Sequence, residues 1–316
     1  MSKKQEGILA YFSRHNQGYA RKVGNSRTRG AYARYQIVYG HVSRYIREER
    51  GLEDMALCKL GSAFVDRFDR YLRVKRELSP NTVWGYMITL KHILTLAREE
   101  GRMRVNPFAS YINSYTPVDR GYLSEEELVR LMQEPAATPV EGIVRDLFLF
   151  SAFTGLSYID IKHLRKDNLR QLFDGNWWIV TRRHKTRVES DVLLLEVPLR
   201  LIEKYRGVMP DGRLFPVPSN NCCNEHLHVL ERRCGFRTHL TFHVGRHSFA
   251  MLALNRGMPI ETLSSILGHT NIRTTQIYAK ITNKKVSEDM TRLAAGLSRV
   301  EQDICRQIGG SGTYCI

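Results

Sequence analysis

The clearest hydrophobic pattern in the first third of the chain is an apolar face with helical spacing. After Ser79 and Pro80, apolar residues recur every three or four positions up to Gly101. Proline suits the first turn of a helix, because an N–H at that position has no partner within the helix, and glycine is typical of helix ends. Similar patterns over 29–49 and 60–76 predict further helices.

The remainder of the first third lacks such a pattern. Residues 1–28 are polar and rich in arginine, so we expect a flexible basic arm. A proline-containing loop over about 106–122 separates the first helical patterns from those that follow. We therefore predict a helical domain over 29–118 and a second domain over 119–316.

The second domain begins with helical signals and then changes period. Ser124 and Glu127 have the spacing of a capping box, and a long apolar helix is predicted to end at Gly155. Period-two patterns predict an antiparallel meander at 168–173, 177–185 and 191–197, and helical patterns return at 219–233, 246–256, 259–267 and 271–281. The predicted fold is mainly α with a small antiparallel sheet.

The charge balance indicates a polyanionic partner. Lys and Arg number 48 against 32 Asp and Glu, which gives a formal net charge of +16. Residues 1–118 hold 21 Lys and Arg and 10 Asp and Glu, against 27 and 22 in 119–316. Because the surplus lies on predicted helices, it favours nucleic acid as the partner.

Several other classes are disfavoured. No apolar run approaches the ~18–20 residues that span a bilayer, and the polar start does not resemble a secretory signal, so we expect a cytoplasmic protein without a membrane partner. Cys222, Cys223, His226, His228 and Cys234 crowd one segment, but it has the pattern of an amphipathic helix and lacks zinc-finger spacing. We expect reduced thiols, no metal and no cofactor.

An ordered set of polar residues in the second domain carries the chemical signal. Lys185 follows a predicted strand, His243 and Arg246 lie three positions apart, His269 follows Leu-Gly, and Tyr278 comes nine residues later. Each of these residues alone is common in structural roles. The ordered set is far more specific.

The set resembles that of the tyrosine recombinases, the phage-integrase-like family of site-specific DNA strand-exchange enzymes. The resemblance extends from about residue 29 onward, and the segments LTFHVGRHSFA, LGHT and TQIYAKI resemble the branch carried on mobile elements of gut anaerobic bacteria. It implies a SAM-like core-binding domain over 29–118 and an α+β catalytic domain over 119–316.

The chemistry of reversible strand cleavage explains why these residue types are needed. A tyrosine hydroxyl conserves the bond energy as a phosphotyrosyl ester, and cations stabilise the charge that develops on the phosphate. The resemblance implies that Tyr278 is the nucleophile and Lys185 the general acid. It also implies that Arg246 and His269 hold the phosphate and that His243 assists proton transfer. No metal is needed, because the cations are built in.

One position departs from the family pattern. After the sequence TGL at 154–156 the family has an arginine, whereas this chain has Ser157. Arg183 is the first candidate substitute, because it lies two residues before Lys185 on the same strand face. Arg145, upstream on the helix that ends at Gly155, is the second. Either another arginine replaces the missing one, or the enzyme is impaired.

The resemblance implies double-stranded DNA with specific recombination sites as substrate and a homotetramer on two DNA sites, in the bacterial nucleoid. It favours DNA inversion or mobile-element integration and excision, and it leaves open whether accessory DNA-bending proteins take part. A type IB topoisomerase and a catalytically impaired DNA-binding regulator are the alternatives. An apolar stripe at Val286, Met290, Leu293 and Leu297 is expected to pack on a neighbouring protomer or within its own chain.

Overall fold

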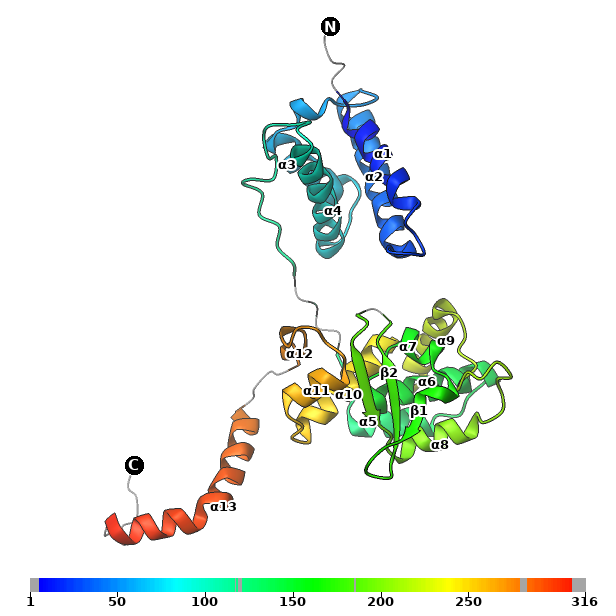
Figure 1. Ribbon diagram of the computed structural model, residues 1–316, viewed down its shortest axis with the longest axis vertical. Coiled ribbons are helices and arrows are strands. Elements are labelled where there is room, and N and C mark those ends of the chain that lie inside the picture. The colour runs from blue at the N-terminus through cyan, green and yellow to red at the C-terminus, as the bar shows by residue number, and fades with distance from the viewer. Residues whose placement is uncertain (1–5, 117, 119–120, 185, 279–282, 309–316) are drawn as a thin grey trace. The chain divides into compact units, whose positions relative to one another are not determined.

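The computed structural model describes residues 6–116, 118, 121–184, 186–278 and 283–308. The chain divides into two compact units, residues 1–118 and 119–316 (Figure 1). Among the described residues, no helix is both long enough and apolar enough to cross a membrane.

The described part of the first unit is all helical. Its α-helices are α1 (Ile8–Ala20), α2 (Arg29–Arg50), α3 (Ser62–Arg70) and α4 (Pro80–Glu99), with a 3-10 turn η1 (Leu57–Lys59) and a π-helical turn η2 (Tyr71–Lys75) around α3. Buried side chains from every α-helix form one core, among them Phe12, Val42, Phe68, Met87 and Leu90. The predicted helices after residues 29, 60 and 79 are confirmed.

The prediction of a flexible arm over 1–28 is wrong for the helix α1. Ile8 and Phe12 are fully buried, and the Phe12 ring meets Tyr39 edge to face at 5.7 Å between centroids. The Leu9 N–H donates to Asp54 Oδ1 at 2.9 Å. The apolar residues of α1 cover the core next to α2, so their burial outweighs the polar composition of the segment.

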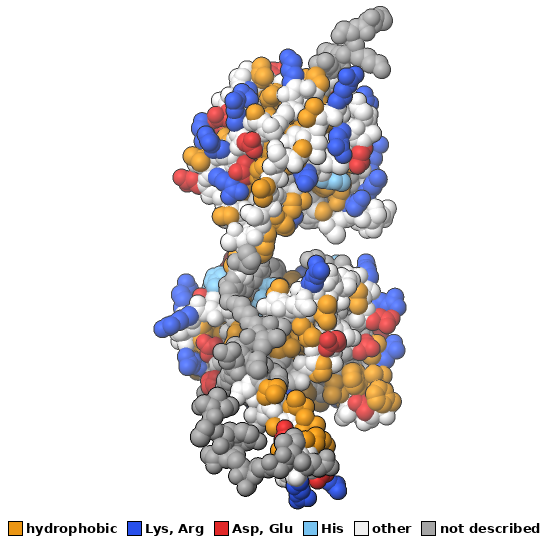
Figure 2. Space-filling view, turned by 90° about the vertical axis from the view of Figure 1, so that its left-hand side faces the viewer, with side chains coloured by type: hydrophobic (Ala, Val, Ile, Leu, Met, Phe, Trp, Pro, Cys, Tyr) orange, Lys and Arg blue, Asp and Glu red, His pale blue; other side chains and the backbone are white. Residues whose placement is uncertain are grey.

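Lys and Arg side chains are spread over the face of the first unit that Figure 2 shows. Arg50, Arg67, Arg70 and Lys75 line one hollow beside η2. Lys75 is paired with Glu49 across this hollow, whereas Arg67 and Arg70 are exposed on α3.

The second unit combines helices with a small sheet that has one face exposed. In chain order its elements are α5 (Glu125–Gln133), α6 (Pro139–Thr154), α7 (Tyr158–His163), η3 (Lys166–Asn168), β1 (Leu169–Gln171), β2 (Trp177–Arg182), β3 (Glu189–Leu193), α8 (Glu196–Lys204), α9 (Asn220–Cys234), α10 (Phe242–Asn255), α11 (Ile260–Ile266), α12 (Arg273–Gln276) and α13 (Asn283–Ile308). The strands are antiparallel in the order β1-β2-β3. The predicted fold class is confirmed, although the third strand ends earlier than expected because α8 begins at Glu196.

Helix α6 is the buried centre of the second unit. The predicted end of α6 is confirmed, because Gly155 follows its last residue with φ +70°. The predicted capping box of Ser124 and Glu127 is found at the start of the neighbouring helix α5. Gly245 of α10 lies so close to α6 that an added Cβ would be 3.2 Å from the Ser151 Cβ. This close approach brings the start of α10 against the end of α6.

Helix α13 presents apolar side chains to solvent. Met290, Leu293 and Leu297 are 57%, 52% and 39% exposed, and Val300 and Ile304 continue the same face. The Val286 side chain lies outside the described part of the chain.

Candidate active site

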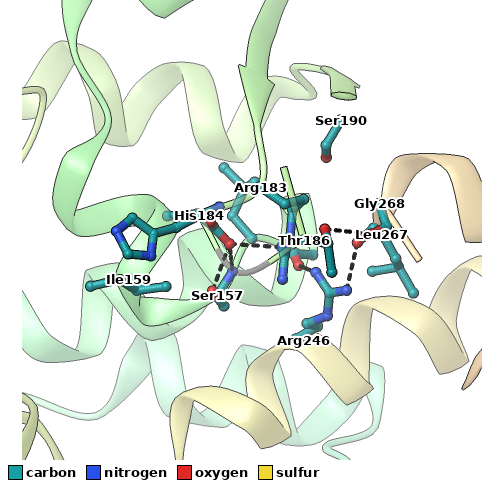
Figure 3. A network of polar contacts seen from close by, with 12 residues as sticks. Ser157, Ile159, Arg183, His184, Thr186, Ser190, Arg246, Leu267 and Gly268 are labelled. Carbon is teal, nitrogen blue, oxygen red and sulfur yellow. Dashed lines mark hydrogen bonds and ion pairs between the residues drawn. The ribbon is translucent and has the colours of Figure 1, made fainter. Parts of the chain in front are cut away.

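Arg246 is the buried centre of the site. It follows Gly245 on α10, is 4% exposed, and extends between two loops (Figure 3). Its Nη1 donates to the Gly155 carbonyl at 2.7 Å, and its Nη2 donates to the Leu267 carbonyl at 2.6 Å. The end of α6 and the end of α11 therefore hold the guanidinium from both sides.

The electrostatic environment of Arg246 favours an additional negative charge. Burial, together with the nearby Arg183 cation, lowers the pKa of Arg246 to about 10. Among the described residues, its hydrogen-bond partners are two carbonyl oxygens and an imidazole, and none is a carboxylate. A buried guanidinium in this state gains from an anion that accepts its hydrogen bonds.

Arg183 lies at the end of β2 and is held by Asp160 of α7. Its Nη1 is 2.8 Å from Asp160 Oδ2, and both side chains are buried. The same carboxylate accepts the Ser157 hydroxyl at 2.6 Å and the His184 N–H at 2.9 Å. Burial lowers the pKa of Arg183 even though Asp160 opposes the shift. Asp160 therefore binds both Arg183 and Ser157, and position 157 is the one at which the family pattern has an arginine.

The β2–β3 turn is tied to the loop after α11. The Thr186 hydroxyl donates to the Gly268 carbonyl at 3.2 Å, and the Ser190 hydroxyl donates to the Ile266 carbonyl at 2.6 Å. Figure 3 shows the labelled Arg183 and Thr186 on one side and Leu267 and Gly268 on the other, with Arg246 below them. Two segments far apart in sequence therefore form one wall of the site.

His269 lies beside Arg246 in its neutral form. Its Nε2 is 2.9 Å from Arg246 Nη2, and its Nδ1 is 2.8 Å from the hydroxyl of the fully buried Thr275. Because arginine only donates, Nε2 accepts and Nδ1 carries the proton, which it donates to Thr275. Burial and the two guanidinium groups lower the pKa of His269 to about 4.

Tyr278 is near Arg246 but largely buried. Its ring packs with Ala250, Leu263 and Leu267, and it contacts the His247 ring edge to face at 4.8 Å. The His247 ring in turn lies 4.4 Å from the exposed His243 ring. The Tyr278 phenol is close enough to Arg246 to raise the pKa of the guanidinium, whereas burial lowers that pKa.

The structure brings most of the predicted site residues together. These are Arg246, Arg183, His269, Ser157, Tyr278 and His243. Lys185 lies outside the described residues. Arg145, in the middle of α6, is held by Asp146 and by the Glu134 carbonyl at the end of α5, so the structure does not bring it to this group.

Two supporting residues, Asp160 and Thr275, were missed as site components, and His247 has the packing role expected for it beside the named residues. Asp160 orders Ser157 and Arg183, Thr275 fixes the His269 tautomer, and the His247 ring bridges His243 and Tyr278. The spacing of Ser157 and Asp160, a polar residue followed three positions later by a carboxylate, was a readable helix-start signal.

Two buried guanidinium groups, a neutral histidine and a tyrosine lie together on a helical scaffold, a set of groups that can bind a phosphate beside a hydroxyl nucleophile. The Phage integrase family matches residues 121–285, and the Phage integrase SAM-like domain matches residues 8–115. The chain belongs to the phage integrase family and is a tyrosine recombinase, an enzyme of DNA strand cleavage and religation.

Individual relatives agree over most of the chain. The tyrosine recombinase XerD of Shewanella oneidensis is 24% identical over 272 residues, covering 80% of this chain and 87% of that protein. XerC of Neisseria gonorrhoeae is 24% identical over 291 residues, covering 87% and 92%. The Tn1549 transposon integrase in complex with a circular intermediate DNA has a TM-score of 0.70 at 16% identity, covering 90% and 99% of the two chains. XerH bound to its difH substrate has a TM-score of 0.69 at 17% identity, covering 90% and 95%.

Proposed function

We propose that the Arg246 site binds one phosphodiester of double-stranded DNA and exchanges strands at specific recombination sites. The observation that carries the proposal is an excess of buried positive charge. Arg246 and Arg183 lie close together, and among the described residues only one carboxylate, that of Asp160, pairs with either of them. A phosphate supplies the missing charge, and its two non-bridging oxygens match guanidinium donors.

The proposed step exchanges one ester for another. The Tyr278 oxygen forms a bond to phosphorus while the bond from phosphorus to the 5′-oxygen breaks, and that oxygen takes the electron pair and a proton from Lys185. The phenol proton passes to the His243 imidazole. The products are a 3′-phosphotyrosyl ester and a free 5′-hydroxyl. Because the bond energy is conserved, the reverse attack rejoins DNA without ATP.

In this mechanism Arg183 takes the role of the arginine missing at position 157. The ion pair with Asp160 supports this assignment, because it holds the guanidinium beside the start of α7 and within electrostatic range of Arg246. Ser157 acts indirectly, since its hydroxyl donates to Asp160. Arg145 takes no part, since its guanidinium is held by the Glu134 carbonyl and by Asp146.

The first unit acts as the core-binding domain in this proposal. Its charge surplus and the exposed Arg67 and Arg70 on α3 suit phosphates along a duplex. Such contacts add affinity without sequence information, so binding by this unit weakens steeply with salt.

The proposed assembly is a homotetramer on two DNA sites. The exposed apolar face of α13, which includes Met290 and Leu293, suits contact with a neighbouring protomer. An apolar groove of about 800 Å³, lined by residues that include Met132, Phe153 and Phe249, offers a surface that can receive such a helix. The proposed biological outcome is DNA inversion or mobile-element integration and excision.

Covalent capture tests the reaction. Wild type and Tyr278→Phe are incubated with fragmented host DNA, adducts are isolated under denaturing conditions, and the attached ends are sequenced. We expect adducts from wild type alone, at a few sites with inverted repeats. Ends scattered over all sequences indicate a type IB topoisomerase instead, and tight DNA binding without any adduct indicates a regulator.

A further inference from the structure

A cluster of metal-ligating side chains lies outside the recombination site, where α9 is followed by the segment that leads into α10. His228 and Glu231 lie three positions apart on α9, so they share a helix face. His239, from the segment 235–241, completes the cluster. One ligand atom from each residue lies within 4.8 Å of the others. We propose that His228, Glu231 and His239 bind a single Zn²⁺ ion that fastens this segment to α9.

The distances suit zinc. Glu231 Oε2 is 3.3 Å from the Nδ1 atoms of both histidines. With zinc–ligand bonds of about 2.0–2.1 Å, neighbouring ligand atoms of a tetrahedral site lie about 3.3 Å apart. Both Nδ1 atoms face the same carboxylate oxygen, and the two rings stack at 4.0 Å between centroids, so the exposed His239 ring must turn for both nitrogens to point at one ion. Two imidazoles and a carboxylate are a usual zinc donor set, and imidazole nitrogen disfavours Mg²⁺ and Ca²⁺.

The carboxylate is available and already oriented. The Leu240 N–H donates to Glu231 Oε2 at 2.8 Å, an outer hydrogen bond of the kind that orients metal ligands. Arg233, two positions further along α9, is paired with Glu134 and Glu141 instead. Arg233 therefore does not form its ion pair with the Glu231 carboxylate.

The exposure of the cluster leaves room for a water as the remaining ligand. The His239 side chain is 68% exposed and that of His228 is 34% exposed, whereas that of Glu231 is 18% exposed. The ion would cross-link α9 to the segment immediately before Phe242, where the helix with Arg246 begins. Its role is structural, since zinc binding to the folded state stabilises that state. The proposal does not depend on the recombination mechanism.

The test uses full-length protein without a histidine tag, stripped of metal with a chelator. Adding Zn²⁺ should bind about one equivalent and raise the melting temperature by several degrees, because the ion binds the folded state. Co²⁺ in place of Zn²⁺ should give the visible absorption of a tetrahedral site. Both effects should be lost in His239→Ala and in His228→Ala.

His226→Ala is the matched control. His226 is a partly exposed histidine on the same helix, four residues after Cys222, and these two residues are the neighbouring alternative ligands. The control should keep the zinc equivalent and the thermal shift. The proposal is overturned if stripped wild type neither binds zinc nor shifts its melting temperature, or if His226→Ala abolishes binding while His239→Ala does not.

Discussion

The side chain of Arg183 crosses directly over Gly268. A Cβ at position 268 would lie 2.4 Å from Arg183 Cγ, and Gly268 has φ +58°. The glycine of the Leu-Gly-His sequence is therefore required for two reasons: its backbone is left-handed, and the Arg183 side chain leaves no room for a Cβ.

Gly268→Ala is expected to destabilise the protein and to abolish most strand cleavage. The strained backbone costs about 1 kcal/mol, and Arg183 must also leave its place beside Asp160. Denaturant unfolding and adduct formation measure the two effects. Gly175→Ala is the matched control, since Gly175 has φ +71° with open space around it. Equal adduct yields from the two variants would contradict the role given to Gly268.

Arg183→Ala is expected to reduce adduct formation ~10²–10³-fold, the usual effect of removing one donor from a preorganised anion site. Arg145→Ala is the comparison, because Arg145 bonds to the Glu134 carbonyl and Asp146 away from the site. It should retain near-normal adduct formation per folded molecule. A larger loss with Arg145→Ala than with Arg183→Ala would reverse the assignment. The measurement is the single-turnover rate of adduct formation on a DNA site identified by covalent capture.

Asp160→Asn is expected to lower the free energy of unfolding by ~3–5 kcal/mol. The substitution leaves Arg183 buried without its counter-charge, next to Arg246. High phosphate concentration should restore part of the loss, because an anion then supplies the charge. Asp191→Asn, an exposed position on β3, is the control. Similar free energies of unfolding for the two variants would contradict the claim that Asp160 stabilises the buried Arg183.

The stability of the protein should fall with acid in a manner that depends on His269. Its pKa is lowered from 6.5 to about 4 in the folded state, so the unfolded chain binds the proton first. The contribution of His269 is therefore fully present above pH 6.5 and is lost as the pH falls towards 4. Unfolding free energies across this window should decline less steeply for His269→Gln. An identical slope in both proteins would contradict the assignment.

Binding of DNA should reverse that pKa shift. A phosphate beside His269 favours the imidazolium, whose Nε2 then donates to the phosphate instead of accepting from Arg246. DNA binding at mildly acidic pH is therefore expected to take up a proton. Calorimetry in buffers with different ionisation enthalpies detects the uptake, and Thr275→Val tests whether the Nδ1 partner contributes. Binding heats that do not depend on the buffer would exclude this proton transfer.

Local rules predicted the elements whose causes are local. The Ser124–Glu127 capping box and the helix end at Gly155 depend on residues within a few positions of each other, and both were predictable. The ordered polar set pointed to Arg246, His269 and Tyr278 for the same reason, since each lies within a recognisable short segment.

Tertiary contacts explain what the sequence could not predict. Helix α1 looked like a polar arm because its burial depends on packing against α2 and α4, which the segment itself does not show. Arg145 was a plausible substitute by residue type, but it lies nine residues before Thr154, about 14 Å along a straight helix. Asp160 could be recognised as a capping residue, whereas its ion pair with Arg183 depends on how β2 reaches α7.

Placing the phosphate-binding arginine at the end of β2 has a mechanical consequence in the proposed mechanism. Arg183 and Lys185 are two positions apart, so at most ~7 Å of backbone separates the group that grips the phosphate from the group that protonates the leaving oxygen. An arginine at position 157 would sit on α7 and would act independently of that turn. In the proposed mechanism both groups belong to one short stretch of backbone, so a displacement of that stretch would remove the phosphate contact and the proton donor together.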